Sequence, residues 1–244
     1  MRDQIVILAA GKGTRMGGAV PKVLAMLKNK PLILYVLEEI EKINQLAKPI
    51  IVVGYKSEKV KAVVGEDFIY SIQDKQLGTA HALLAAKHKV IGENILVLYG
   101  DMPLVKSSTL KKLLTMHHAA HTNISMLTTI VPNFEGIYKS LNHSGRIERQ
   151  NGKLTKIVEY KDASAKQKEI LELNAGVYVF NAKWLWENIE RIKNTNAQAE
   201  YYLTDIVEIA IAAGEKVKDM QADGEEIVGV NSPEDLKLVE KLVK

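Results

Sequence analysis

Short, almost wholly apolar runs alternate along the first half of the chain with segments of helical periodicity. The runs QIVIL (4–8), PIIVV (49–53) and ILVLY (95–99) carry hydrophobic side chains at nearly every position. Such runs are typical of parallel strands that helices cover on both faces, and parallel strands need right-handed crossovers. The alternation predicts an α/β fold with a doubly wound, mostly parallel sheet, whose ligands bind at the carboxyl ends of the strands.

The pattern changes after residue 130. The segment GRIERQNGKLTKIVEY (145–160) contains two short strand-like runs around Asn151 and Gly152. An Asn-Gly pair supplies the positive φ angles of a tight hairpin turn. NAGVYVF (174–180) has the composition of a further strand. We therefore expect the second half to extend the same sheet and to add a small β lid unit.

Two helices are expected near the end of the chain. The segment YYLTDIVEIAIAAG (201–214) has helical periodicity, and 232–243 reads as a helix with Ser232 as N-cap and Pro233 in its first turn. The chain has 244 residues, of which 47% are hydrophobic, so it is long enough to bury a full core. We expect a single domain over 1–244, with halves 1–130 and 131–244.

Composition excludes several classes of protein. The chain has no cysteine, so it has neither disulfides nor thiolate metal sites, and no run approaches the ~20 apolar residues of a membrane span. Its net charge of +4 comes from scattered lysines rather than a basic stripe. We expect a cytoplasmic protein that binds neither nucleic acid nor membrane and is a monomer or weak dimer.

The loop LAAGKGTRM (8–16) is the first candidate ligand site. Gly11 and Gly13 let the backbone bend sharply, and successive N–H groups in such a bend form a concave anion site. Arg15 and Lys22 add positive charge nearby. The loop matches neither the dinucleotide nor the Walker fingerprint. A flexible turn with solvated basic residues is the alternative interpretation.

Further stretches match a known family in order and nearly in spacing. They are LAAGKGTRMGGAVPKVL, QLGTAHAL, LYGDMPL, GRIERQNGKLTKIVEYKDA, NAGVYVF, NAQAEYYLTDIV and VGVN. Together they make the chain resemble the sugar-1-phosphate nucleotidylyltransferases, in particular the uridyltransferase domain of bacterial bifunctional N-acetylglucosamine-1-phosphate uridyltransferase/glucosamine-1-phosphate acetyltransferases. The resemblance covers essentially residues 4–243. It implies a Rossmann-like fold, and the family's C-terminal left-handed β-helix is missing, so we expect no acetyltransferase activity.

The resemblance also implies an activity and its substrates. UTP and N-acetylglucosamine 1-phosphate would react, with Mg²⁺, to give UDP-N-acetylglucosamine and pyrophosphate. Carried over position by position, the catalytic residues are Arg15 and Lys22; the nucleotide-binding residues are Leu8, Ala9, Ala10, Gly11, Gly13, Gln73, Gly78 and Thr79; the substrate-binding residues are Gly100, Gly145, Glu159 and Asn174; and the metal ligands are Asp101 and Asn231. The amide of Gln73 would read the uracil edge, because an amide offers both a donor and an acceptor.

Asp101 also stands out without the resemblance. It follows an apolar strand in LYGDMPL, where we expect a surface-facing carboxylate that gains neither core packing nor an obvious partner. Mg²⁺ needs only one or two protein oxygens besides water and substrate phosphates, so Asp101 with the amide of Asn231 is an adequate donor set.

One departure from the family's pattern leaves alternatives open. NHSG (142–145) replaces the glycine-tyrosine pair that the family usually has before Gly145. The chain is therefore also compatible with a same-fold nucleotidyltransferase for another NTP or another sugar or alcohol phosphate, or with a non-catalytic nucleotide-binding regulator.

MHHAAH (116–121) contains a histidine pair at zinc-like spacing, but we favour an ordinary helix end because no third ligand is evident.

Overall fold

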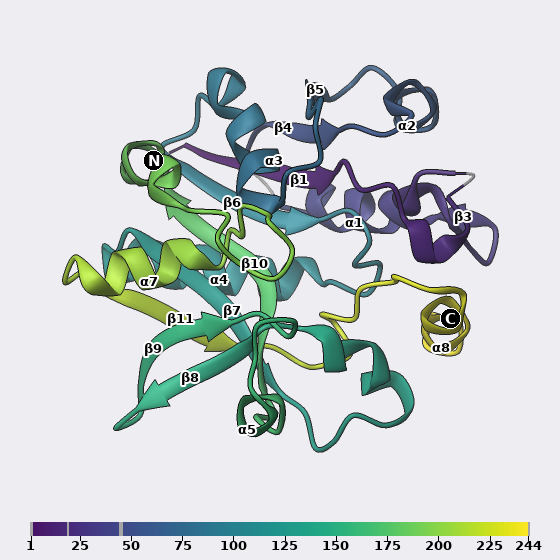
Figure 1. Cartoon of the computed structure of the whole chain (residues 1–244). Coiled ribbons are helices and arrows are strands. Elements are labelled where there is room, and N and C mark those ends of the chain that lie inside the picture. Colours follow the sequence, from purple (N-terminus) through teal and green to yellow (C-terminus); the bar gives the residue numbers. More distant parts are fainter. Residues whose placement is uncertain (1, 19, 44–45, 244) are drawn as a thin grey trace.

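The computed structural model describes residues 2–18, 20–43 and 46–243 (Figure 1). The strands are β1 (Asp3–Ala9), β2 (Met26–Leu27), β3 (Lys30–Pro31), β4 (Leu46–Val53), β5 (Ile69–Ile72), β6 (Asn94–Tyr99), β7 (Ile124–Ile130), β8 (Arg146–Gln150), β9 (Lys153–Val158), β10 (Glu172–Asn181) and β11 (Val217–Gln221). The α-helices are α1 (Leu32–Glu41), α2 (Ser57–Val64), α3 (Thr79–Ala85), α4 (Ser107–Ala120), α5 (Ala165–Lys168), α6 (Ala182–Asn188), α7 (Asp205–Ala212) and α8 (Pro233–Glu240). Short 3₁₀ helices are η1 (Thr14–Met16), η2 (Lys22–Leu24), η3 (Lys87–Lys89), η4 (Gly136–His143) and η5 (Ile189–Arg191).

The strands form one large sheet in the order β11-β7-β10-β6-β1-β4-β5. β1 pairs in parallel with β4 and β6, as do β4 with β5 and β7 with β11. β10 alone on this path runs antiparallel, between β6 and β7. The expected mostly parallel sheet is confirmed, and strands from both halves of the chain belong to it.

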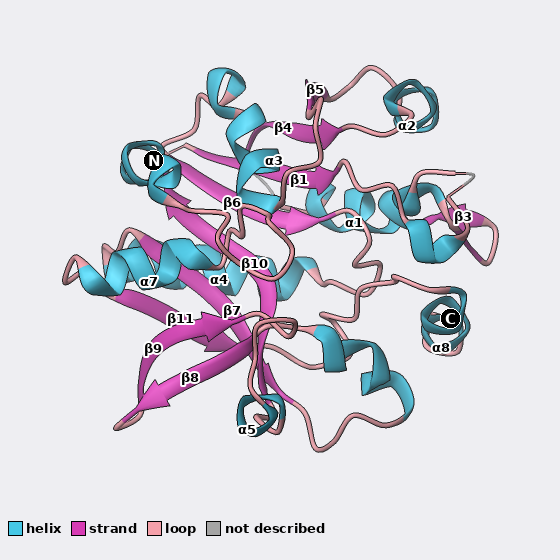
Figure 2. Ribbon diagram, viewed as in Figure 1, coloured by secondary structure: helices cyan, strands magenta, loops and turns pink. Residues whose placement is uncertain are grey.

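Helices cover both faces of the sheet (Figure 2). Successive side chains of β1 point to opposite faces, so Ile5 and Ile7 pack in one core with residues of α1, α2, α4 and α8. Val6 and Leu8 pack in the other core with residues of α3, α6 and α7. This double burial explains why the strand is apolar at nearly every position, and it confirms the doubly wound fold.

The hairpin predicted from Asn151 and Gly152 is present as β8 and β9. Both turn residues have positive φ angles, 52° and 76°. β8 joins the main sheet at β10, so the hairpin projects from the sheet (Figure 1). Ser232 caps the last helix by accepting a hydrogen bond from Asp235 N, and Pro233 occupies the first turn, as expected.

The helix expected over 201–214 begins later, at Asp205. Tyr201 instead pairs its backbone with the segment before α3: its N donates to Leu77 O at 2.8 Å, and its O accepts from Ala80 N at 2.9 Å. Because its backbone is bonded in this way, Tyr201 is not part of the helix. These bonds also attach the second half of the chain to the loop at Gly78. In the described part of the chain, no helix is long and apolar enough to span a membrane.

Candidate active site

Two adjoining pockets open at the carboxyl edge of the sheet and share Lys22, Tyr99 and Asp101. The chain leaves β1 and β6 in opposite directions, and such a switch point creates a crevice between the two loops. The β1-side pocket is lined by Leu8, Ala9, Ala10, Gly11, Lys22, Val23, Gln73, Gln76, Gly78, Thr79, Ala82, Tyr99, Asp101 and Glu200. The hairpin-side pocket is lined by Lys22, Tyr99, Asp101, Met102, Ser140, Leu141, Ser144, Gly145, Glu159, Asn174, Ala175, Gly176, Ile227, Gly229 and Asn231.

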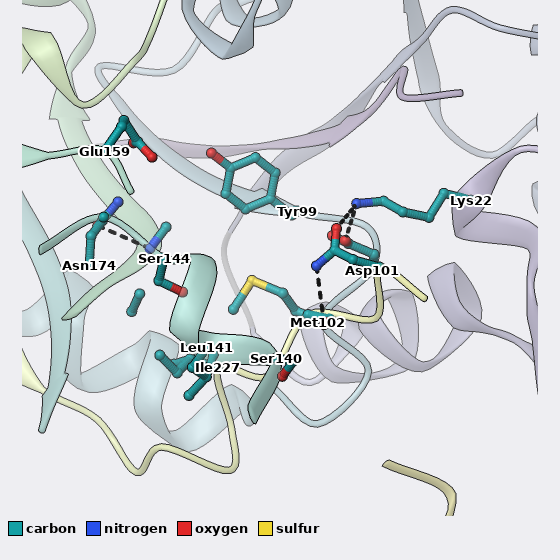
Figure 3. Close-up of a pocket in the computed structure, with 15 residues that line it drawn as sticks. Lys22, Tyr99, Asp101, Met102, Ser140, Leu141, Ser144, Glu159, Asn174 and Ile227 are labelled. Atoms are coloured by element: carbon teal, nitrogen blue, oxygen red, sulfur yellow. Dashed lines mark hydrogen bonds and ion pairs between the residues drawn. The ribbon is translucent and has the colours of Figure 1, made fainter. Parts of the chain in front are cut away.

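Lys22 connects the two residues expected to bind metal. Its Nζ forms an ion pair with Asp101 Oδ2 and donates a 2.9 Å hydrogen bond to Asn231 Oδ1 (Figure 3). Val230 N donates to Asp101 O at 3.0 Å, which fixes the loop before Asn231 against the end of β6. The expectation that Asp101 is surface-facing and without a partner is wrong, because it is 5% exposed and paired with Lys22. A lysine so distant in sequence is not recognisable as its partner.

These oxygens fit a magnesium ion. Asp101 Oδ2 and Asn231 Oδ1 both face the single Lys22 Nζ, so the two oxygens converge on one position that already holds positive charge. Carboxylate and amide oxygens are hard ligands of the kind Mg²⁺ prefers, and two of them suffice when substrate phosphates supply others. Among the described residues, no group of three or more His, Asp or Glu side chains forms a metal site.

The side chains of Gln73 and Thr79 form hydrogen bonds with other residues of the chain. Gln73 is 3% exposed, and its Nε2 lies 3.1 Å from Gly78 O, to which it donates. Thr79 begins α3, and its Oγ1 accepts a hydrogen bond from Leu203 N at 2.9 Å. A Cβ on Gly78, at φ +112°, would lie 2.5 Å from Tyr201 O, so only glycine permits this approach of the two segments.

Glu159 and Asn174 lie across the hairpin-side pocket from Lys22 and Asp101 (Figure 3). Asn174 Oδ1 accepts from Tyr178 OH at 2.8 Å and from Gly176 N at 3.1 Å. These bonds orient the amide so that its NH₂ group remains for a ligand. Gly145 contributes backbone to the same wall, and a Cβ there would lie 2.8 Å from Ile157 Cγ2.

The carboxyl of Glu159 is in an environment that favours its neutral form. Burial raises its pKa, the hydrogen bond that it accepts from Thr204 Oγ1 at 2.9 Å opposes this, and the negative charges of Asp205 and Asp162 raise it again. Asp205 is affected in the same way: burial and the charges of Glu208 and Asp162 raise its pKa to about 6. The hairpin-side pocket thus contains a carboxyl well suited to hydrogen bonding with neutral hydroxyl or amide groups.

Tyr99 is the residue of the site that the sequence interpretation missed. It lines both pockets, and burial together with the charges of Glu159 and Asp101 raises the pKa of its hydroxyl. Its ring lies against Gly176, where a Cβ would be 2.5 Å from Tyr99 Cε2. In the sequence, Tyr99 is only the last residue of an apolar strand. A glycine inside a strand, as in NAGVY, can mark a close approach of another segment, but it does not identify the partner.

Three candidate residues do not line either pocket. Arg15 lies in η1 and is exposed. Gly13 supports Lys22 instead: its φ is +65°, and a Cβ would lie 2.7 Å from Lys22 Cβ. Gly100 is buried, and a Cβ there would meet Val23 Cγ1 at 3.1 Å. Its close packing beneath the loop accounts for glycine at this position, and the proposed substrate contact of Gly100 stays a prediction.

The histidines of MHHAAH contact neighbouring polar groups. His117 Nδ1 lies 3.0 Å from Ser125 Oγ, and His118 Nε2 lies 3.0 Å from Asp3 Oδ1. His121 ends α4 in the left-handed conformation, at φ 46°. His117 and His118 therefore bond to different neighbours, and His121 ends the helix through its backbone.

The fold is a doubly wound α/β domain with two adjoining pockets at its switch point, the place where proteins of this class bind their ligands. The family model of the MobA-like NTP transferase domain matches residues 5–151. The chain belongs to this family of nucleotidyltransferases.

Similar proteins agree with this assignment. The chain is 40% identical to "Bifunctional protein GlmU" of Brevibacillus brevis over 98% of its own length and 51% of that protein, and equally identical to the GlmU of Geobacillus thermodenitrificans over the same shares. The chain thus spans about half the length of these curated relatives. Its fold is similar to that of a UDP-glucose pyrophosphorylase complexed with UDP-glucose (TM-score 0.77, 17% identity, 99% and 98% of the two chains). A putative glucose-1-phosphate thymidylyltransferase from Bacillus anthracis is also similar (TM-score 0.75, 19% identity, 98% and 94%).

Proposed function

We propose that the protein transfers the uridylyl group of UTP to N-acetylglucosamine 1-phosphate, releasing pyrophosphate and forming UDP-N-acetylglucosamine. The observation that carries the proposal is the pair of pockets that meet at Lys22, Tyr99 and Asp101. A nucleotide in the β1-side pocket and a sugar phosphate in the hairpin-side pocket would meet at this shared position. The 40% identity to GlmU proteins supports the choice of substrates.

The reaction requires two anions to approach each other. An oxygen of the sugar phosphate attacks the α-phosphorus of UTP, the new P–O bond forms, and the bond from the α-phosphorus to the bridging oxygen breaks, so that pyrophosphate leaves with the electron pair. The protein must align the groups and balance their charge. Lys22 is suited to this because its ammonium lies where the pockets join, and Arg15 in the exposed η1 would act on the triphosphate.

Asp101 and Asn231 would hold Mg²⁺, which would supply positive charge to offset the charge of the phosphates. The ammonium of Lys22 bridges these two side chains and would contact a substrate phosphate beside them. The backbone of 9–11 lines the β1-side pocket and would bind the nucleotide through N–H groups, and Gln73, Gly78 and Thr79 in the same pocket would contact its base. Glu159, Asn174 and Gly145 would bind the hydroxyls and the N-acetyl group of the sugar.

Pyrophosphate release tests the proposal directly. The purified chain is assayed with Mg²⁺ and each of UTP, CTP, TTP, ATP and GTP, against N-acetylglucosamine 1-phosphate, glucosamine 1-phosphate and glucose 1-phosphate. We expect release with UTP and N-acetylglucosamine 1-phosphate to exceed every other pair. Faster release with another pair would identify a different nucleotidyltransferase, and nucleotide binding without release for any pair would indicate a regulator.

A further inference from the structure

The amide of Gln73 is fixed from two sides by groups of the protein. Its Nε2 donates to Gly78 O at 3.1 Å and lies 3.0 Å from Nδ1 of His81. A backbone carbonyl only accepts hydrogen bonds, so the contact with Gly78 identifies the NH₂ side of the amide. The second N–H of Nε2 is then available for His81.

This arrangement determines the tautomer of His81. Because Gln73 Nε2 is a donor, Nδ1 must accept, and the proton of the neutral ring is on Nε2. His81 lies in the first turn of α3 and does not line the β1-side pocket. Its ring borders a separate groove with Leu77, Leu84 and Tyr201, and it reaches the β1-side pocket through its contact with Gln73.

The position of Gly78 is equally constrained. Tyr201 pairs its backbone with Leu77 and Ala80 on either side of Gly78, and no side chain fits at residue 78. The carbonyl of Gly78 is therefore an acceptor in a fixed position beside the amide. Reversing the Gln73 amide would direct its oxygen at this carbonyl and would also force His81 into the tautomer that donates from Nδ1, which costs at least the bond to Gly78 at a side chain that is 3% exposed.

With both N–H groups engaged, the amide has its oxygen left for the pocket. Uracil presents an N3–H donor at the edge where cytosine presents an N3 acceptor. We propose that His81 is a positioning residue that, together with the carbonyl of Gly78, holds this amide in the orientation that favours uracil over cytosine. The inference rests on the proposed function, since it concerns the base of the same nucleotide.

The test compares His81→Leu, which removes the acceptor, with His81→Asn, whose Oδ1 replaces Nδ1 as an acceptor. His88→Asn, an exposed histidine in η3, is the matched control. For each protein, kcat/KM is measured with UTP and with CTP, and their ratio is compared. We expect His81→Leu to lower the ratio of kcat/KM with UTP to kcat/KM with CTP about tenfold, which corresponds to the loss of one hydrogen bond in a buried site. His81→Asn and the control should leave this ratio unchanged.

A merely structural role predicts a different result. Damage to α3 would lower kcat/KM for both nucleotides equally and leave the ratio unchanged, and that outcome overturns the proposal. Should leucine prevent folding, His81→Ala removes the same acceptor without adding bulk.

Calorimetric titration with UTP and CTP, without sugar phosphate, separates this inference from the proposed function. If the native chain makes no pyrophosphate but binds UTP over CTP, and His81→Leu loses that preference, the function is wrong and the inference holds. Equal binding of the two nucleotides by the native chain refutes the inference.

Discussion

The ammonium of Lys22 donates a 2.9 Å hydrogen bond to Oδ1 of Asn231, although the residues lie 209 positions apart in the chain. The same ammonium pairs with Asp101. One side chain from the beginning of the chain therefore joins an acid at the end of β6 to an amide near the C-terminus. A cation at this point connects the three segments that border the junction of the two pockets.

Lys22 and a divalent cation are expected to compete for the same two oxygens. Lys22→Met should therefore bind Mg²⁺ about fivefold more tightly in the absence of nucleotide, because the variant no longer has to break an ion pair. Isothermal titration with MgCl₂ measures this. Lys30→Met, which removes the ion pair of Lys30 with Glu38 at the surface, is the control and should leave the affinity unchanged. Weaker binding by Lys22→Met would contradict the competition.

Gly176→Ala should destabilise the protein more than Gly152→Ala. Both glycines have similar φ angles, +72° and +76°, so each alanine has a backbone cost of about 1–2 kcal/mol. At Gly152 nothing lies within 4 Å of the added Cβ, whereas at Gly176 it would lie 2.5 Å from the Tyr99 ring. Urea denaturation should show an additional loss of about 1–3 kcal/mol for Gly176→Ala. Equal losses would mean that Tyr99 adapts without cost.

Much of the fold is predictable from local sequence. Buried parallel strands need apolar residues on both faces, so β1, β4 and β6 appear as continuous apolar runs. Asn151 and Gly152 specify their turn through backbone conformation alone. The direction of a strand cannot be predicted in this way, because NAGVYVF would be equally apolar in a parallel strand. The reversal of β10 therefore could not be predicted.

Most of the candidate site was predictable through the matched motifs rather than from single residues. Gln73 is identified only within its motif, whereas Asp101 also stands out by itself, and both line a pocket. The partner of Asp101 and the contact of Tyr99 with Gly176 depend on segments that meet only in the folded chain. Arg15 is in the matched loop yet lies outside both pockets, so its role stays a prediction.

Glu159→Gln should stabilise the protein at neutral pH while impairing sugar binding. The folded pKa of Glu159 is raised above its ordinary value near 4.5, chiefly by burial. Its contribution to stability is therefore complete below that value and is lost as the pH rises through the folded pKa. The stability gain of Glu159→Gln should grow between pH 4.5 and pH 7.5 in thermal denaturation.

The same variant should raise KM for the sugar phosphate and leave KM for UTP nearly unchanged. Glu187→Gln replaces an exposed carboxylate of α6 and serves as the control in both measurements. A variant that is less stable than the native chain at pH 7.5 would show that the ionised carboxylate is favourably bound.

His117 should make the protein less stable in mild acid. Burial, with a smaller effect from His118, lowers its pKa from 6.5 to about 4. Between these values the unfolded chain binds a proton that the folded chain does not, so stability falls as the pH falls from 6.5 to 4. Urea denaturation of His117→Gln over this range should show a shallower decline than the native chain. His88→Gln, at an exposed position, should follow the native curve.

Asp101 and Asn231 are proposed to act through one ion at the junction of the two pockets. A double-mutant cycle on pyrophosphate release, measured across a Mg²⁺ titration, tests whether they do. Asp101→Ala should lower kcat about a hundredfold or more, Asn231→Ala should lower it less, and the double variant should be little worse than Asp101→Ala alone. Fully additive losses, or an Asp101→Ala protein with a near-normal rate and unchanged magnesium dependence, would contradict a shared metal.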